Sequence, residues 1–104
     1  MKEYLKFYIN GEWVDPVEPR TLEVENPATE ESYARISLGS KADVDKAVAA
    51  AKSAFPAFSQ TSVEYRAELL DKITAGIQKR MPEMAEAVST EMGAPMWLAN
   101  AAQV

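Results

Sequence analysis

Short apolar runs separated by turn-forming residues occupy the first third of the chain, a pattern typical of strands joined by turns. Residues 7–9 and 12–14 flank the dipeptide Asn10-Gly11, which tolerates the positive φ angles of a two-residue turn. They predict a β-hairpin that pairs Phe7 with Val14, Tyr8 with Trp13 and Ile9 with Glu12. Because an isolated hairpin is marginal in water, we expect it to pack on another element.

Two further short strands are expected after the hairpin. Residues 21–25 place Leu22 and Val24 between polar neighbours, and residues 33–38 form a second short run that ends before a glycine. The Asn-Pro-Ala-Thr segment at 26–29 lies between them, and its proline presets the φ angle of a turn. These segments complete the strand-forming part of the chain.

From Ser40 onward the apolar period changes to three and four residues, which indicates helices. Ser40 is a good N-cap, and Asp43 lies in the first turn, where negative charge is favourable. One apolar face of this helix comprises Val44, Ala47, Val48, Ala51 and Phe55. Pro56 has no N–H to donate and crowds the preceding turn, so we expect the helix to end or kink there.

The remaining sequence predicts two or three more helices. Thr61 and Glu64 have the spacing of a capping box, and Pro82 is suited to the first turn of a third helix. Gly93 is expected to terminate that helix, and a fourth is expected to begin after Pro95. The apolar positions of the second and third helices are Leu69, Leu70, Ile73, Ile77, Met81, Met84, Ala85, Val88 and Met92.

The predicted fold class is therefore α+β, with an N-terminal β-hairpin and short strands over residues 1–38, followed by three to four helices over residues 40–104.

Composition excludes several kinds of chemistry. The 104 residues include no cysteine and no histidine, so thiolate or imidazole catalysis cannot occur within the chain. The net charge of −5 disfavours nucleic acid and anionic membranes as partners. No run approaches the roughly 18 apolar residues of a membrane span, and charges interrupt the first residues, so no signal peptide is expected. We expect a cytoplasmic protein.

Candidate chemistry at the residue level is sparse. The glycines are too scattered for a nucleotide-binding loop, and neighbouring carboxylates such as Glu23 and Glu25 are expected to lie on a solvated surface. Tyr8 and Trp13 could form a stacking platform, but a packing pair is the better interpretation. Helical spacing of the methionines favours core or subunit packing over a binding groove. The residues alone therefore indicate no catalytic group.

Several segments, in order, resemble the aldehyde dehydrogenase superfamily. The opening run FYINGEWV at 7–14 is similar to that family's first hairpin, and VENPATEE at 24–31 is similar to its NPATGE turn. DVDKAVAAAKSAF at 43–55 and RAELLDKI at 66–73 resemble its next two helices. EMGAP at 91–95 resembles its ExGKP turn. The resemblance covers essentially the whole chain.

Members of that family are several times longer than this chain and oxidise aldehydes to acids with NAD or NADP. The resemblance implies that residues 1–104 are an incomplete amino-terminal part of the α/β cofactor-binding domain, in a parent that is a homo-oligomer (dimer or tetramer). The family's nucleophilic cysteine, general-base glutamate and dinucleotide-binding residues lie beyond residue 104. We therefore expect no catalytic and no cofactor-binding residue here, and an inactive chain when it is alone.

The resemblance also implies that this stretch lacks the central parallel sheet on which the family's helices pack. The apolar positions Leu70, Ile73, Ile77, Val88 and Met92 would then need another surface. Leaving such a stripe in water costs several kcal/mol at about 25 cal/mol per Å², comparable to the stability of a small domain. We expect the chain by itself to be weakly folded or to associate through its helices.

One metal site of the family would fall within this stretch. Some members bind a monovalent cation through backbone carbonyls before the Asn-Pro turn, which here means Val24 and Glu25. The third ligand, an acid in those proteins, aligns with the neutral Gln103. Two other departures are Glu30, where glycine is usual, and Ala94, where lysine is usual.

A second hypothesis is a free-standing helical interaction module derived from that family, which would act by packing its helices on a partner protein. A coding sequence that continues in frame beyond Val104 toward a glycine-flanked cysteine supports the enzyme, and a natural stop codon there supports the module.

Overall fold

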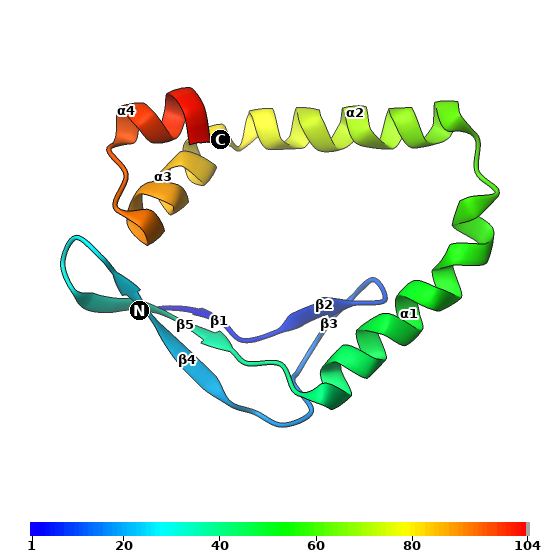
Figure 1. Ribbon diagram of the computed structural model, residues 1–104, viewed down its shortest axis with the longest axis horizontal. Coiled ribbons are helices and arrows are strands. Elements are labelled where there is room, and N and C mark those ends of the chain that lie inside the picture. Colours follow the sequence, from blue (N-terminus) through cyan, green and yellow to red (C-terminus); the bar gives the residue numbers. More distant parts are fainter. Residues whose placement is uncertain (104) are drawn as a thin grey trace. The chain divides into compact units, whose positions relative to one another are not determined.

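The computed structural model describes residues 1–103, and the chain divides into two compact units. The first unit comprises residues 1–24 and 32–60, and the second comprises residues 25–31 and the chain from residue 61 onward. Strands and one long helix make up the first unit, and helices and one turn make up the second (Figure 1). The α+β fold class expected from the sequence is confirmed.

The strands lie in two separate sheets. They are β1 (Lys2–Tyr4), β2 (Phe7–Ile9), β3 (Glu12–Val14), β4 (Thr21–Asn26) and β5 (Glu31–Ser37). One sheet has three strands in the order β1-β5-β4, and the other contains β2 and β3. Strand β1 pairs in parallel with β5, in a register that places Glu3 opposite Arg35. The sequence pattern did not predict β1, because its three residues are all exposed and carry no alternation.

The β2–β3 hairpin forms in the predicted register. Phe7 pairs with Val14, Tyr8 with Trp13 and Ile9 with Glu12. Both turn residues have positive φ, 55° at Asn10 and 79° at Gly11, as a two-residue hairpin turn requires. The Tyr8 and Trp13 rings lie 5.1 Å apart between centroids in a tilted arrangement, so they pack against each other as expected.

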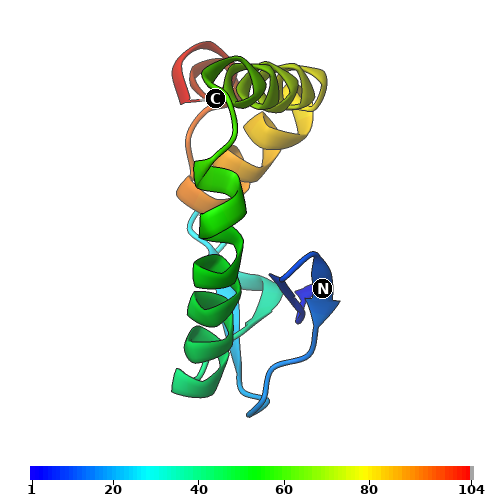
Figure 2. The same cartoon turned by 90° about the vertical axis from the view of Figure 1, so that its right-hand side faces the viewer.

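Helix α1 (Lys41–Ser59) begins with a reciprocal cap. The Asp43 backbone N–H donates to the Ser40 hydroxyl at 3.4 Å, and the Ser40 backbone N–H donates to the Asp43 carboxylate at 2.9 Å. An end or a kink was expected at Pro56, and the end is wrong, because the helix continues to Ser59 (Figure 2). Pro56 removes one helical hydrogen bond close to the C-terminus, and the last turn still closes through the bond from the Gln60 N–H to the Ala57 carbonyl.

The second unit contains helices α2 (Val63–Lys79), α3 (Met81–Met92) and α4 (Met96–Leu98), and the π-helix η1 (Ala99–Gln103). The N-cap of α2 is Ser62 rather than the predicted Thr61, since the Tyr65 N–H donates to the Ser62 hydroxyl at 3.1 Å. The Thr61 carbonyl instead accepts a bond of 2.7 Å from the Arg66 guanidinium. The cap therefore lies one residue later than predicted, and Thr61 interacts with Arg66 instead.

The other helix boundaries agree with the sequence analysis. Pro82 lies in the first turn of α3, and Gly93 ends that helix with a left-handed φ of 75°. The fourth helix begins after Pro95, but only one turn is α-helical before the backbone widens into η1. No helix within residues 1–103 is long and apolar enough to cross a membrane.

The Asn-Pro turn between β4 and β5 forms as predicted. The Asn26 carbonyl accepts from the Glu30 N–H at 2.8 Å, and the Asn26 side chain accepts from the Ala28 N–H at 2.9 Å. Glu30 has a positive φ of 58°, a conformation that glycine adopts without cost. The turn lies against the end of α3, where Pro27 is so close that a Cβ added to Gly93 would lie 3.4 Å from it.

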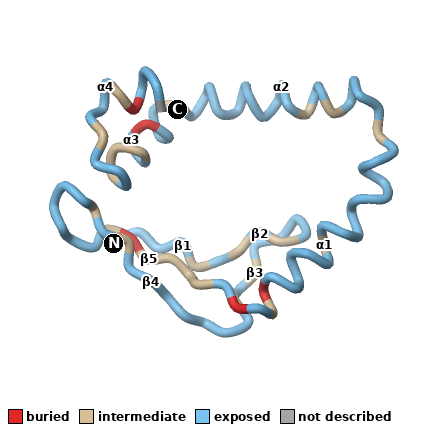
Figure 3. The backbone as a smooth tube through the Cα atoms, viewed as in Figure 1, coloured by how far each residue is buried: buried red, intermediate tan, exposed pale blue. Residues whose placement is uncertain are grey.

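Buried residues are few and small. The buried apolar residues among those described are Ala34, Ala85 and Ala99, and no large side chain there is fully buried (Figure 3). Large exposed apolar side chains lie on both long helices, including Val44, Phe55, Leu70, Ile73 and Ile77. The chain therefore has very little hydrophobic core of its own.

Candidate functional site

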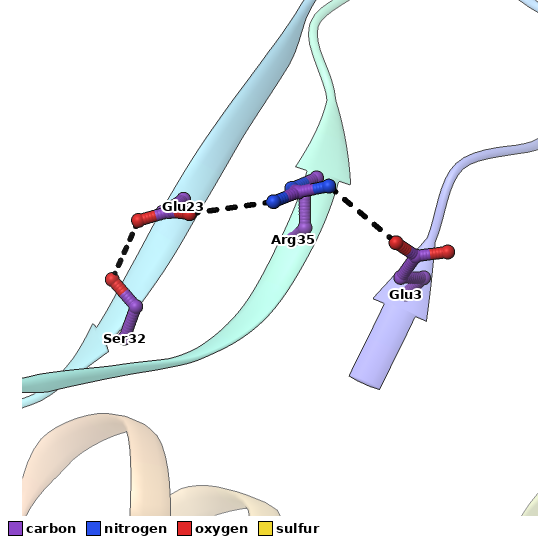
Figure 4. Close-up of polar contacts among 4 residues, drawn as sticks. All are labelled: Glu3, Glu23, Ser32 and Arg35. Carbon is purple, nitrogen blue, oxygen red and sulfur yellow. Dashed lines mark hydrogen bonds and ion pairs between the residues drawn. The ribbon is translucent and has the colours of Figure 1, made fainter. Parts of the chain in front are cut away.

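The most connected polar cluster crosses all three strands of the β1-β5-β4 sheet. Arg35 on β5 forms ion pairs of 3.5 Å with Glu3 on β1 and with Glu23 on β4 (Figure 4). The Ser32 hydroxyl donates to the other carboxylate oxygen of Glu23 at 2.8 Å. The guanidinium thus holds two carboxylates that belong to strands far apart in the sequence.

This cluster is suited to holding strands together and not to catalysis. The hydrogen bond from Ser32, and then that from Arg35, lowers the pKa of Glu23 below its ordinary value. A carboxylate with a lowered pKa remains ionised at neutral pH, so it is a poor general acid and a weak base. The side chains are also well exposed, which weakens their attraction through solvent screening. The solvated surface expected for Glu23 is therefore what the structure has.

Asp43 is the one buried carboxylate among the described residues. Its carboxylate accepts from the Ser40 N–H and hydroxyl, and from the Val17 backbone N–H at 3.0 Å. The bond from the Ser40 N–H, and then that from Val17, lowers the pKa of Asp43. All of these partners stabilise the ionised form, so Asp43 anchors the loop before β4 to the start of α1 and has no proton to offer.

Three open hollows lie along the hairpin and α1 within the first unit. Their volumes are about 400, 430 and 400 Å³. The first is lined by hairpin residues such as Phe7 and Ile9 and by Val44 and Ala47 of α1. These walls are mainly apolar, and the carboxylate of Asp43 is already occupied by the bonds above. The hollows therefore fit apolar packing better than the binding of a polar substrate.

The structure does not test the predicted cation site. Val24, half-buried, and Glu25, exposed, are neighbours on β4, and Gln103 is the last residue of η1. The side chain of Gln103 lies outside the described part of the chain. Within that part, no three or more acidic side chains gather where they could hold a metal. The site remains a prediction.

Of these features, sequence reasoning missed the Arg35 cluster and the bond from Val17 to Asp43. Both depend on contacts between residues more than ten positions apart, and the exposed strand β1 carries no periodic signal. A basic residue opposite a carboxylate is informative only once the strand pairing is known.

The sequence and the fold of this chain are similar to those of known proteins. The sequence profile of the Aldehyde dehydrogenase family matches residues 13–104. A putative aldehyde dehydrogenase of Staphylococcus aureus is 48% identical over 100 residues, which are 96% of this chain and 21% of that protein. The chain therefore belongs to the aldehyde dehydrogenase family, and it corresponds to an amino-terminal portion of such a protein.

Solved structures agree with this assignment. The chain superimposes on an aldehyde dehydrogenase of Bartonella henselae with a TM-score of 0.97 and 48% identity, over 99% of this chain and 22% of that one. A mutant of aldehyde dehydrogenase C of Pseudomonas syringae, crystallised with NAD⁺ and octanal, gives a TM-score of 0.93 and 50% identity over 95% of this chain and 20% of that one. The chain thus spans about a fifth of the length of the relatives it matches.

Proposed function

We propose that the chain functions as the amino-terminal portion of an NAD(P)-dependent aldehyde dehydrogenase that oxidises an aldehyde to a carboxylic acid. Within that enzyme its role is structural, and the groups that react lie in the remainder of the polypeptide. The observation that carries this proposal is the match in fold, a TM-score of 0.97 at 48% identity, to a fifth of an aldehyde dehydrogenase. No observation specifically favours a free-standing interaction module.

The distribution of apolar side chains supports a structural role. Only three alanines form the buried apolar set among residues 1–103, while Leu70, Ile73 and Ile77 on α2 are exposed. Apolar area of this extent stabilises a fold only when it is covered, at about 25 cal/mol per Å². The rest of an aldehyde dehydrogenase subunit would supply that cover.

The proposed reaction requires an electron acceptor and water. Aldehyde, water and NAD⁺ give the carboxylic acid, NADH and a proton, so the cofactor accepts the hydride. Relatives of known structure contain this cofactor: the Pseudomonas syringae enzyme, PnpE, and a mutant of betaine aldehyde dehydrogenase from Staphylococcus aureus. Because these 104 residues contain no cysteine, we propose that the nucleophilic cysteine belongs to the remainder of the enzyme. We further propose a cytoplasmic location and a dimeric or tetrameric parent.

A chimera tests the proposal directly. The 104 residues would replace the matching segment of aldehyde dehydrogenase C from Pseudomonas syringae, with its own cysteine intact. We expect the purified chimera to fold and to produce NADH from NAD⁺ and octanal. The host enzyme without the segment should lose this activity, and the chain alone should produce no NADH.

The outcomes separate folding from function. Circular dichroism and size-exclusion chromatography report whether the chimera folds, and NADH absorbance reports turnover. A well-folded chimera without activity, in this host and in the Staphylococcus aureus relative, contradicts the proposal. Turnover by the chain alone would contradict its assignment to a structural role.

The cation site is a separate part of the proposal, taken from the family resemblance. The backbone oxygens of Val24 and Glu25 and the amide oxygen of Gln103 are neutral donors of the type that hard cations accept. We expect potassium or sodium to raise the melting temperature of the chimera relative to choline at equal ionic strength. The Gln103→Leu variant should lose this difference and Gln103→Glu should keep it. Equal melting temperatures of the original chimera in all three salts would eliminate the site.

A further inference from the structure

The turn of the first hairpin places the dipeptide Asn10-Gly11 at the surface. Asn10 and Gly11 are both exposed, and both have positive φ. A Cβ added to Gly11 would meet nothing within 4 Å, so the space beside its α-carbon is open. Within the described chain, the Asn10 side chain makes no hydrogen bond. The carboxamide of Asn10 is therefore unrestrained and precedes an exposed glycine without a side chain.

The other two asparagines have different surroundings. Asn26 is followed by Pro27, whose nitrogen carries no hydrogen, and its side-chain oxygen accepts from the Ala28 N–H at 2.9 Å. Asn100 lies in η1, and its side-chain amide donates to the Met96 carbonyl at 2.9 Å. The structure thus distinguishes one free asparagine from two that are restrained.

We propose that Asn10 is a site of spontaneous deamidation, through which the first hairpin is irreversibly modified. The backbone nitrogen of Gly11 loses its proton and attacks the side-chain Cγ of Asn10. The new N–C bond closes a five-membered imide, and the side-chain nitrogen leaves as ammonia. Water then adds to either imide carbonyl and yields aspartate or isoaspartate. The reaction is thus a substitution at the Asn10 carboxamide followed by hydrolysis of the imide, and it needs no oxidant or reductant.

Opening of the hairpin controls the rate of this step. Ring closure needs rotation about the Cα–C bond of Asn10, and the hydrogen-bonded turn restrains that rotation. A ribbon of two strands is only marginally stable, and this one is held by the packing of Tyr8 on Trp13. Each transient opening exposes Asn10 to attack, so a weaker hairpin should deamidate faster.

Isoaspartate would change the fold of this region. It carries the main chain through the side-chain carbons, which adds one atom to the backbone of a two-residue loop. Loop length sets the register of a hairpin, so the Tyr8–Trp13 pair would be displaced. The new carboxylate also adds a negative charge to a chain of net charge −5.

The test is an incubation of the full chain at mildly alkaline pH, followed by peptide mapping and by labelling with an isoaspartyl methyltransferase. We expect Asn10 to convert before any conversion is detected at Asn26 or Asn100. Trp13→Ala should accelerate conversion roughly three- to tenfold, which corresponds to about 0.6–1.4 kcal/mol of lost hairpin stability. The chain unfolded in urea supplies the upper limit of the rate.

The control is Asn10→Gly, which keeps the residue types that a two-residue turn favours but removes the side-chain amide. It should abolish isoaspartate labelling without changing the circular dichroism spectrum. Conversion at Asn100 or Asn26 that equals that at Asn10 would overturn the proposal. A rate that is the same in the folded chain, in Trp13→Ala and in urea would overturn the role of hairpin opening. The urea comparison holds even if Trp13→Ala is poorly folded.

Discussion

Glycine-to-alanine substitutions at two positions should change stability in opposite directions. Gly93 ends α3 with a φ of 75°, whereas Gly76 lies inside α2 with nothing within 4 Å of an added Cβ. Alanine at Gly93 must adopt a left-handed conformation, which costs about 1–2 kcal/mol for an L-residue. Alanine also restricts the unfolded chain, which returns about 0.4–1 kcal/mol. Taking the midpoints of these two ranges, we expect Gly93→Ala to lower the free energy of unfolding by about 0.8 kcal/mol.

The backbone conformation, and not a steric clash, accounts for most of this cost at Gly93. An added Cβ would lie 3.4 Å from the Cγ of Pro27, the near limit of ordinary van der Waals contact. Removing Pro27 should therefore not rescue the substitution, and Gly93→Ala should cost about the same in a Pro27→Ala background. Gly93→Asn should cost less, because asparagine tolerates the left-handed region.

Gly76→Ala supplies the matched control. In a helix interior, alanine is favoured over glycine by about 1 kcal/mol, and the space around Gly76 is open. Urea unfolding followed by far-ultraviolet circular dichroism measures both variants, with an unchanged denaturant slope as the check that the same transition is compared. The reasoning is refuted if Gly93→Ala is as stable as the original chain, or if the two alanine variants move together.

Three further predictions follow from the contacts of the first unit and the exposed helices. Because folding lowers the pKa of Asp43, the stability that the ionised Asp43 carboxylate contributes is present at neutral pH and is lost as the pH falls below about 4. Asp43→Asn should therefore lower the melting temperature at neutral pH and flatten its dependence on acid pH, and an unchanged pH profile of the melting temperature would contradict this prediction. Arg35→Ala should speed hydrogen exchange at the β1 amides and change the melting temperature little, because the ion pairs of Arg35 are exposed. Equal exchange rates in the variant and the original chain would show that other contacts hold β1. Light scattering should show that the isolated chain associates more as its concentration rises, and that the variants Leu70→Glu and Ile73→Glu associate less. An isolated chain that is monomeric and melts sharply would disprove this prediction.

Features that depend on near neighbours could be predicted from the residues alone. Asn10-Gly11 specifies a hairpin register because only a few residue types accept two successive positive φ angles. The cap of α1 at Ser40 and the end of α3 at Gly93 are likewise decided within one helical turn. The order of short motifs was sufficient to indicate the family, which the comparisons established.

Features that join distant residues could not be predicted in this way. Strand β1 is formed by three exposed residues whose pairing partner lies about thirty positions away, so no local pattern could reveal it. The bond from Val17 to Asp43 and the contact of Pro27 with Gly93 have the same origin. Local rules describe the backbone over a few residues, whereas these contacts exist only after the chain has folded.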